Sequence, residues 1–310
     1  MPHRGNDQGQ EDALLSTPTR HYESFAGHPN GAKQSQSNNM QSWADYLNTN
    51  IATRHTDLIL IVCFAVSGLI DSGAYNAYTC FMSMQPSNNS PHKTGNTVFA
   101  ALGVSNLPQT QPRHAWTKSV ASIIAYLLGA LFFANFHRAA GQTKRWVFAF
   151  SFLLQAIVTT GAAILVGSRS VSGSPVSPPG ILTALPKDPG FPWADLIPIA
   201  LLAFQASGKV CASRMVGFNA LPTVVLTTLY SDFMGDPKLF FGLTANPMRN
   251  RRLMGVLFYF GGAVAAGQLV KSNVGFAGLL YIAAAVKLVV VIAWVLWPAE
   301  KAENDESSES

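Results

Sequence analysis

The chain has 310 residues, of which 48% are hydrophobic and only 12% are charged, and its formal net charge is +5. Soluble domains carry about a quarter charged residues, so this deficit and the long apolar runs exclude an ordinary soluble domain and predict an all-α polytopic membrane protein. The positive charge does not indicate nucleic-acid binding, because the basic residues stand at the ends of apolar runs, where membrane proteins keep them.

Residues 1–55 are rich in Gln, Asn, Ser, Gly and His and show no hydrophobic periodicity. This composition predicts a disordered N-terminal region without a signal peptide, and the acidic residues 299–310 predict a disordered tail. The membrane domain, 56–298, contains six apolar segments of about the 20 residues that a transmembrane helix needs. They are 58–82, 119–136, 146–167, 195–218, 253–270 and 275–297.

Two shorter apolar pieces, 97–104 and 221–230, are too short to cross a membrane comfortably alone. A Pro/Gly-rich loop at 169–193 divides the domain into the halves 56–168 and 194–298, and each half has one long segment, one short piece and two more long segments. We therefore predict a repeat, and three spans in each half would make it an inverted one. The short pieces would then enter from opposite faces as re-entrant or broken segments.

The basic residues favour one topology. If the short pieces do not cross, the N-terminus, 137–145 and 219–252 lie on one side of the membrane, and these segments hold the dense basic clusters. Such clusters belong on the cytoplasmic side, so we predict six spans with both termini cytoplasmic. If both short pieces crossed, "HRAAGQTKR" (137–145) would face outside, which is unfavourable.

Three stretches resemble a known family: "GLIDSGAYNAYTCF" (68–81), "TGNTVFAALG" (94–103) and "ALPTVVLTTLYSDFMGDP" (220–237). They are similar to the YoaK-like family of small membrane proteins, specifically its fungal branch, and the resemblance covers nearly all of 58–297. It implies about six helices and a membrane location, and it names no reaction or substrate. In the family pattern Met-Gln runs directly into Thr-Gly-Asn, whereas "PSNNSPHK" (86–93) intervenes here and changes the spacing from Asp71 to Thr94.

Charged side chains in the middle of a membrane helix cost about 2.5–3.5 kcal/mol on insertion scales. We therefore expect such residues to form ion pairs or to line a water-filled path. The predicted spans hold Asp71, Lys209, Arg214 and Lys287. Asp71 has two interpretations: a proton- or cation-coupled site with Lys209 or Arg214 as counter-charge, or a structural ion pair. Lys209 and Arg214 are five residues apart, so they face different partners.

The short pieces add polar candidates. Thr94, Gly95 and Asn96 open the first piece: Gly95 can take a positive φ, and Thr94 and Asn96 can cap a short helix whose N-terminus holds an anion, or simply cap it. Thr223 opens the second piece in the matching way. The further candidates in that second piece are Thr227, whose hydroxyl can bind a solute or its own helix, and Asp232, which closes it near the predicted cytoplasmic surface.

The sequence does not favour an enzyme. "DSG" (71–73) alone is no aspartic-protease signal, and the histidines at 55, 92, 114 and 137 stand at predicted loop positions. Phosphate-binding, nucleophile-elbow and dinucleotide motifs are absent. The three cysteines lie in apolar runs as packing residues. We expect no cofactor and no metal.

Two functions remain. The first is a small-solute transporter or permease, with a site between the two halves and a coupling proton. The alternative is a non-transporting scaffold or accessory protein in the lipid bilayer, whose deep charges are structural ion pairs. A transporter needs a polar cavity at mid-depth between the short pieces, whereas a scaffold can be packed solid there.

Overall fold

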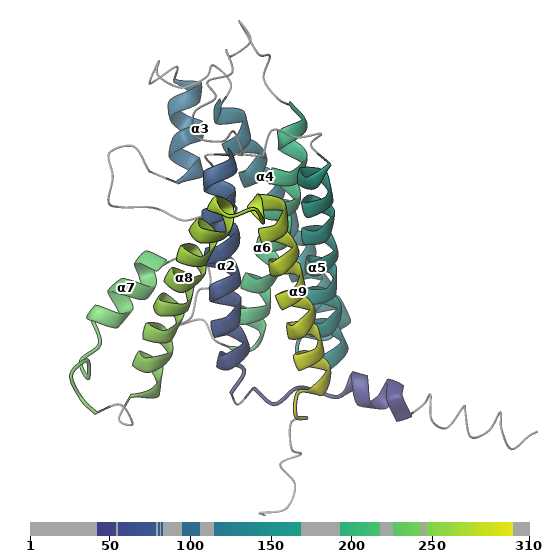
Figure 1. Ribbon diagram of the computed structural model, residues 1–310. Helices are drawn as coiled ribbons and strands as arrows, with labels where there is room; N and C mark the ends of the chain where they lie inside the picture. The colour runs from purple at the N-terminus through teal and green to yellow at the C-terminus, as the bar shows by residue number, and fades with distance from the viewer. Residues whose placement is uncertain are drawn as a thin grey trace, which may run out of the picture. The chain divides into compact units, whose positions relative to one another are not determined.

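A computed structural model describes residues 42–53, 55–78, 80, 82, 95–105, 115–168, 193–217, 226–242 and 246–299. Everything below refers to the part of the chain from Ala44 onwards, which forms one compact unit. Within the described ranges the regular elements are helices, and six of them are long and apolar enough to cross a membrane. Figure 1 shows these six side by side. The predicted all-α polytopic fold is therefore confirmed.

The long helices match the six predicted spans to within a few residues at most ends. They are α2 (Asp57–Tyr78), α4 (Ala115–Ala140), α5 (Arg145–Gly167), α6 (Leu196–Met215), α8 (Pro247–Lys271) and α9 (Gly275–Leu296). A 3₁₀ turn, η1 (Trp193–Asp195), leads into α6. The start of α8 has a clear local cause: the Asn246 side chain accepts a hydrogen bond from the Arg249 N–H, and Pro247 occupies the first turn, where it lacks no needed donor.

The two short predicted pieces form the short helices α3 (Asn96–Val104) and α7 (Leu226–Met234), each of nine residues. A nine-residue helix is only about 14 Å long, roughly half of the hydrocarbon thickness, so neither crosses the bilayer. Helix α3 packs against α4, and α7 packs against α8. In Figure 1, α3 lies at the upper end of the long helices, and α7 lies lower, alongside α8.

The packing does not follow chain order. Helix α2 makes its largest contact with α8, α4 with α6, and α5 with α9. Smaller contacts join α2 to α9 and α5 to α6. All three main pairs therefore link a helix of the first half of the sequence to a helix of the second half.

Glycine permits the close approach at two of these crossings. A Cβ at Gly68 of α2 would overlap the Tyr259 carbonyl oxygen of α8, and a Cβ at Gly262 of α8 would overlap the Ala65 carbonyl oxygen of α2. At the α4–α6 crossing, a Cβ at Gly129 would meet the Phe204 carbonyl oxygen in the same way. Small residues are the usual means of bringing membrane helices into contact.

Two adjacent glycines of α8, Gly261 and Gly262, allow this packing to be tested. We expect Gly262→Ala to destabilise the protein by about 1–3 kcal/mol, because the added methyl group meets backbone rather than a movable side chain. Gly261→Ala is the control, since a Cβ there meets nothing within 4 Å and only improves helix propensity. Unfolding titrations in mixed dodecyl maltoside–SDS micelles measure the difference, and equal effects of the two substitutions would contradict it.

Both ends of the membrane domain are tied to the start of α5. The Ile51 N–H donates to the Thr143 carbonyl oxygen, and the Ala52 N–H donates to the Pro298 carbonyl oxygen. Ile51 is fully buried. The expected disorder of 1–55 thus differs from the structure at its end, because an apolar side chain anchors this stretch. The expected disorder of 1–41 and 300–310 lies outside the described residues.

Arg145 is the centre of this junction. Its guanidinium is buried, donates to the carbonyl oxygens of Tyr46 and Trp297 at 2.6 Å each, and lies 3.9 Å from the centroid of the Tyr46 ring. A guanidinium suits this position because its planar fork reaches two acceptors while it stacks on a ring.

We expect Arg145→Met to lower the free energy of unfolding by about 2–4 kcal/mol, since two charge-assisted hydrogen bonds are lost and two carbonyl groups lose their donor. Arg138→Met is the matched control, because Arg138 is exposed and its hydrogen bonds stay within its own helix. The same micelle titration measures both variants, and a stable Arg145→Met protein would refute this role.

Candidate functional site

A group of polar side chains is buried in the middle of the long helices. We call it the core polar cluster, and it draws on α2, α5, α6, α8 and α9. Its members are Ser67, Asp71, Gln155, Gln205, Lys209, Tyr259 and Lys287. Apart from Tyr259, which is partly buried, none of these residues is more than 3% exposed. The cluster therefore places charge and amide groups where a membrane makes them costly.

Asp71 and Lys209 form the first part of the cluster. The Tyr259 hydroxyl donates to Asp71 Oδ2 at 3.1 Å, which joins α8 to α2. The Lys209 ammonium donates to the Ser67 hydroxyl, one turn below Asp71, and the Asp71 carboxylate acts on it as the opposite charge. Ser67 Oγ in turn donates to the Cys63 carbonyl oxygen at 2.7 Å. Of the two basic residues in the fourth span, Lys209 is the one that reaches α2, through Ser67, and its pairing with Asp71 stays a prediction.

Lys287 forms the second part. Its ammonium donates to Gln155 Oε1 at 3.0 Å and to Gln205 Oε1, so α9 is joined to α5 and α6. Lys209 is close enough to repel it electrostatically, and the Cys63 thiol lies near both lysines. The two parts are therefore one electrostatic unit.

Other predicted site residues lie elsewhere. Arg214 is exposed at the end of α6, as the five-residue spacing from Lys209 requires. Gly95 precedes α3 with a φ of −55°, so it does not use the positive φ that glycine allows, and its position gives α3 no side-chain cap. Asn96 is instead buried against α4, where its amide donates to the Ser122 hydroxyl at 3.0 Å. Its role is to hold α3 on α4.

Three predicted threonines cannot be placed. Thr94 and Thr223 lie outside the described residues, and Thr227 is described only as part of the α7 backbone. The cavity that a transporter needs between the two short pieces stays a prediction.

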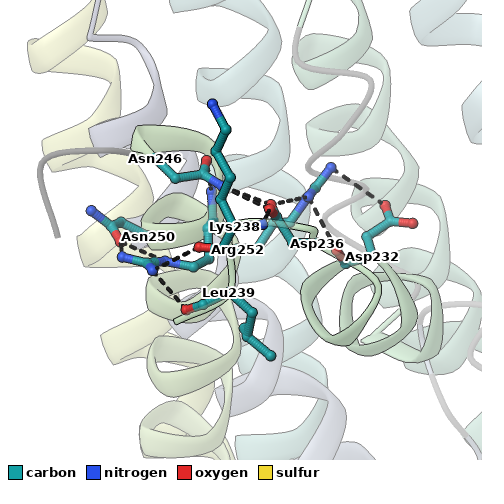
Figure 2. A network of polar contacts seen from close by, with 8 residues as sticks. Asp232, Asp236, Lys238, Leu239, Asn246, Asn250 and Arg252 are labelled. Atoms are coloured by element: carbon teal, nitrogen blue, oxygen red, sulfur yellow. Dashed lines mark hydrogen bonds and ion pairs between the residues drawn. The ribbon is translucent and has the colours of Figure 1, made fainter. Parts of the chain in front are cut away.

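Asp232 belongs to a separate network at the start of α8, shown in Figure 2. The Arg252 guanidinium lies 4.0 Å from the Asp232 carboxylate and 3.4 Å from the Asp236 carboxylate, and it also donates to the Asp232 carbonyl oxygen. The Asn246 amide donates to both oxygens of Asp236. Asp232 therefore helps to hold α7 on α8 and does not reach the core polar cluster.

Arg249 belongs to the same network and binds the turn that follows α7. It is only 5% exposed and donates to the carbonyl oxygens of Leu239 and Phe241 at 2.7 and 2.6 Å. The neighbouring aromatic ring of Phe240 is 96% exposed. The network thus fixes a loop that presents an apolar side chain outwards at the end of a transmembrane helix, a position typical of interfacial anchors.

The backbone N–H of Lys238 and the Asn246 amide, with Arg252 and Arg249 beyond them, hold the pKa of Asp236 below its ordinary value of 3.8. A carboxyl whose pKa is lowered by folding stabilises the folded protein above its unfolded pKa, and this contribution is lost as the pH falls through the folded pKa. We therefore expect Asp236→Asn to lower the Tm at neutral pH, and the difference from wild type to shrink below about pH 4.

Thermal unfolding followed between pH 7 and pH 3 measures this effect, with Asp45→Asn as an exposed control. A difference between Asp236→Asn and wild type that stays constant across this range would contradict the role given to Asp236.

One expectation about histidine was wrong. His137 lies in the last turn of α4, not in a loop, and it is fully buried beside the Phe148 ring. Among the described residues, no group of three or more His, Cys, Asp or Glu side chains is placed to hold a metal ion.

The sequence reasoning missed Gln155, Gln205, Ser67 and Tyr259. The two glutamines had a visible signal, because each interrupts an apolar run inside a predicted span. Considering uncharged amides at membrane depth, as well as charges, would have found both. Ser67 and Tyr259 have no such signal, since serine and tyrosine are common in membrane helices.

Six apolar helices around a buried polar cluster define an integral multi-pass membrane protein. A family model described as "Protein of unknown function (DUF1275)" matches residues 59–293. The chain therefore belongs to this family. No curated protein and no solved structure matches the chain.

Proposed function

We propose that the protein is a small-solute transporter or permease whose site is the core polar cluster, between the two halves of the chain. The carrying observation is the burial of Asp71, Lys209 and Lys287 at membrane depth with partners from both halves. Each such charge costs about 2.5–3.5 kcal/mol to insert, and ionisable groups inside membrane bundles characteristically line solute or proton pathways.

The pattern of helix contacts supports an inverted repeat. Exchanging the three long helices of one half with those of the other (α2 with α6, α4 with α8, α5 with α9) converts the α2–α8 contact into the α6–α4 contact. The same exchange converts α2–α9 into α6–α5 and leaves α5–α9 unchanged. The short helices follow the same exchange, because it converts the α3–α4 contact into the α7–α8 contact. Transporters with inverted repeats bind their solute at the interface of the repeats, near the bilayer midplane.

The position of the short helices agrees with this arrangement. Three spans in each half turn the second half over in the membrane, so equivalent short helices should lie at opposite ends of the bundle. In Figure 1, α3 lies at the upper end of the bundle and α7 lies in its lower half beside α8, so the two are displaced in opposite directions. The close approaches at Gly129 and Gly262 also occupy related places, one in the second span of each half.

The orientation follows from the charges. The first and last described residues of the membrane domain meet at one end, together with the α4–α5 connection. The basic residues Arg249, Arg251 and Arg252 stand at the start of α8, which is at the same end (Figure 1). The positive-inside rule places this end in the cytoplasm and so supports two cytoplasmic termini.

The test begins with a thermal-shift screen of the detergent-purified protein against small metabolites and pH, followed by uptake of each hit in proteoliposomes. A solute at about a hundred times its dissociation constant stabilises a protein by roughly 2.7 kcal/mol, which is readily seen. We expect Asp71→Asn to remain folded and to lose both the shift and the uptake.

Asp57→Asn is the matched control, because it removes a carboxylate that pairs with Arg251 at 2.9 Å outside the core polar cluster. It should keep both signals. If no solute shifts the wild-type protein and Asp71→Asn is itself strongly destabilised, the buried charges are structural and the scaffold alternative holds.

A further inference from the structure

The charges of the core polar cluster do not balance. Asp71 supplies one negative charge, whereas Lys209 and Lys287 supply two positive charges. The Asp71 carboxylate attracts the Lys209 ammonium, although no carboxylate of the described residues lies within 4 Å of either lysine ammonium. Both hydrogen bonds of the Lys287 ammonium go to neutral amide oxygens.

The groups around Lys287 are also short of acceptors. An ammonium has three donors, and two are used. Because Gln155 turns its carbonyl oxygen towards Lys287, its NH₂ group must point away. That NH₂ group has no partner among the described residues, although Gln155 is 0% exposed.

The fold keeps room for this unpaired amide. A Cβ at Gly208 of α6 would lie only 2.6 Å from Gln155 Nε2. Glycine at this position therefore lets the amide sit between α5 and α6, and any larger residue would displace it.

Two more buried groups without a partner lie along the contact between α5 and α9. Ser151 is one helical turn before Gln155 on the same face of α5, and its hydroxyl is unpartnered. Trp294 is two turns after Lys287 on the same face of α9, its ring centroid is 4.7 Å from that of Phe148, and its indole N–H is unpartnered. Buried polar groups in proteins normally have partners, so these unpartnered donors around α5 indicate that acceptors are missing.

We propose that the core polar cluster binds a small monoanion, a carboxylate or an inorganic anion, beside the Lys287 ammonium, with the Gln155 amide as a further donor. One negative charge makes the cluster neutral, and an acceptor-only ligand gives the Lys287 ammonium the acceptor that its third donor lacks. This inference rests on the proposed transport function and assigns the charge class of its substrate.

The first experiment measures the Tm of the full chain in dodecyl maltoside against sodium formate, acetate, chloride and nitrate. Sodium gluconate at the same ionic strength is the bulky reference. We expect one or more small monoanions to raise the Tm progressively with concentration, while gluconate does not. Lys287→Gln should weaken the apparent affinity by about tenfold or more, since a charge-assisted hydrogen bond is lost. Lys238→Gln, an exposed change of the same kind, should leave it unchanged.

A second variant guards against misfolding of Lys287→Gln. Gln155→Glu places a carboxylate of nearly the same shape beside the Lys287 ammonium and so supplies the missing negative charge within the protein. We expect this variant to have a higher Tm than wild type without anions and to lose the anion response. Gln205→Glu provides the same charge from α6 and should behave alike.

The proposal is overturned if the wild-type protein shows no anion-specific shift, or if the shift survives in both Lys287→Gln and Gln155→Glu. These outcomes are separate from the fate of the transport proposal. Anion binding without any anion uptake in proteoliposomes would remove the transporter and keep the site. Uptake of a neutral or cationic solute without an anion response would remove the site and keep the transporter.

Discussion

The cost of burying a lysine at membrane depth constrains the whole arrangement of helices. Lys287 on α9 finds its acceptors on α5 and α6, and Lys209 on α6 finds its hydroxyl acceptor and its opposite charge on α2. Asp71 of α2 accepts in turn from α8. Five of the six long helices therefore supply hydrogen-bond or charge partners to one another's buried polar side chains. Within a bilayer, water cannot replace a missing partner.

Close packing makes these polar contacts possible. Two helices that cross at glycine residues can approach until their backbones touch. Gly68 and Gly262 permit this close approach between α2 and α8. Only at this short separation does Tyr259 of α8 reach Asp71. Gly208 acts similarly on the Gln155 amide. The small residues thus set the distance between neighbouring helices, and the polar residues fix the register of one helix against the next.

The fold could be predicted from sequence because bilayer thickness sets a strong rule. The six spans and two short helices follow from run length alone, and the deep positions of Asp71, Lys209 and Lys287 follow from their places within the runs. Helix partners could not be predicted, since an apolar face does not specify which other apolar face it meets. For this reason Gln205 was not connected to Lys287, and Asp232 was grouped with residues that it does not contact. The threonines of the short pieces remain predictions.

The exchange of partners between the halves has a consequence for biogenesis. Helix α2 is largely enclosed by α8 and α9, which the ribosome makes last. During translation α2 therefore enters the membrane with Asp71 and without Tyr259, while Ser67 and Lys209 meet only after α6 has emerged. The first half is consequently not an autonomous folding unit, and a nascent chain that stops before α8 leaves an acidic helix without its main neighbour in the lipid. Late synthesis of α8 thus sets the moment at which the protein can become stable.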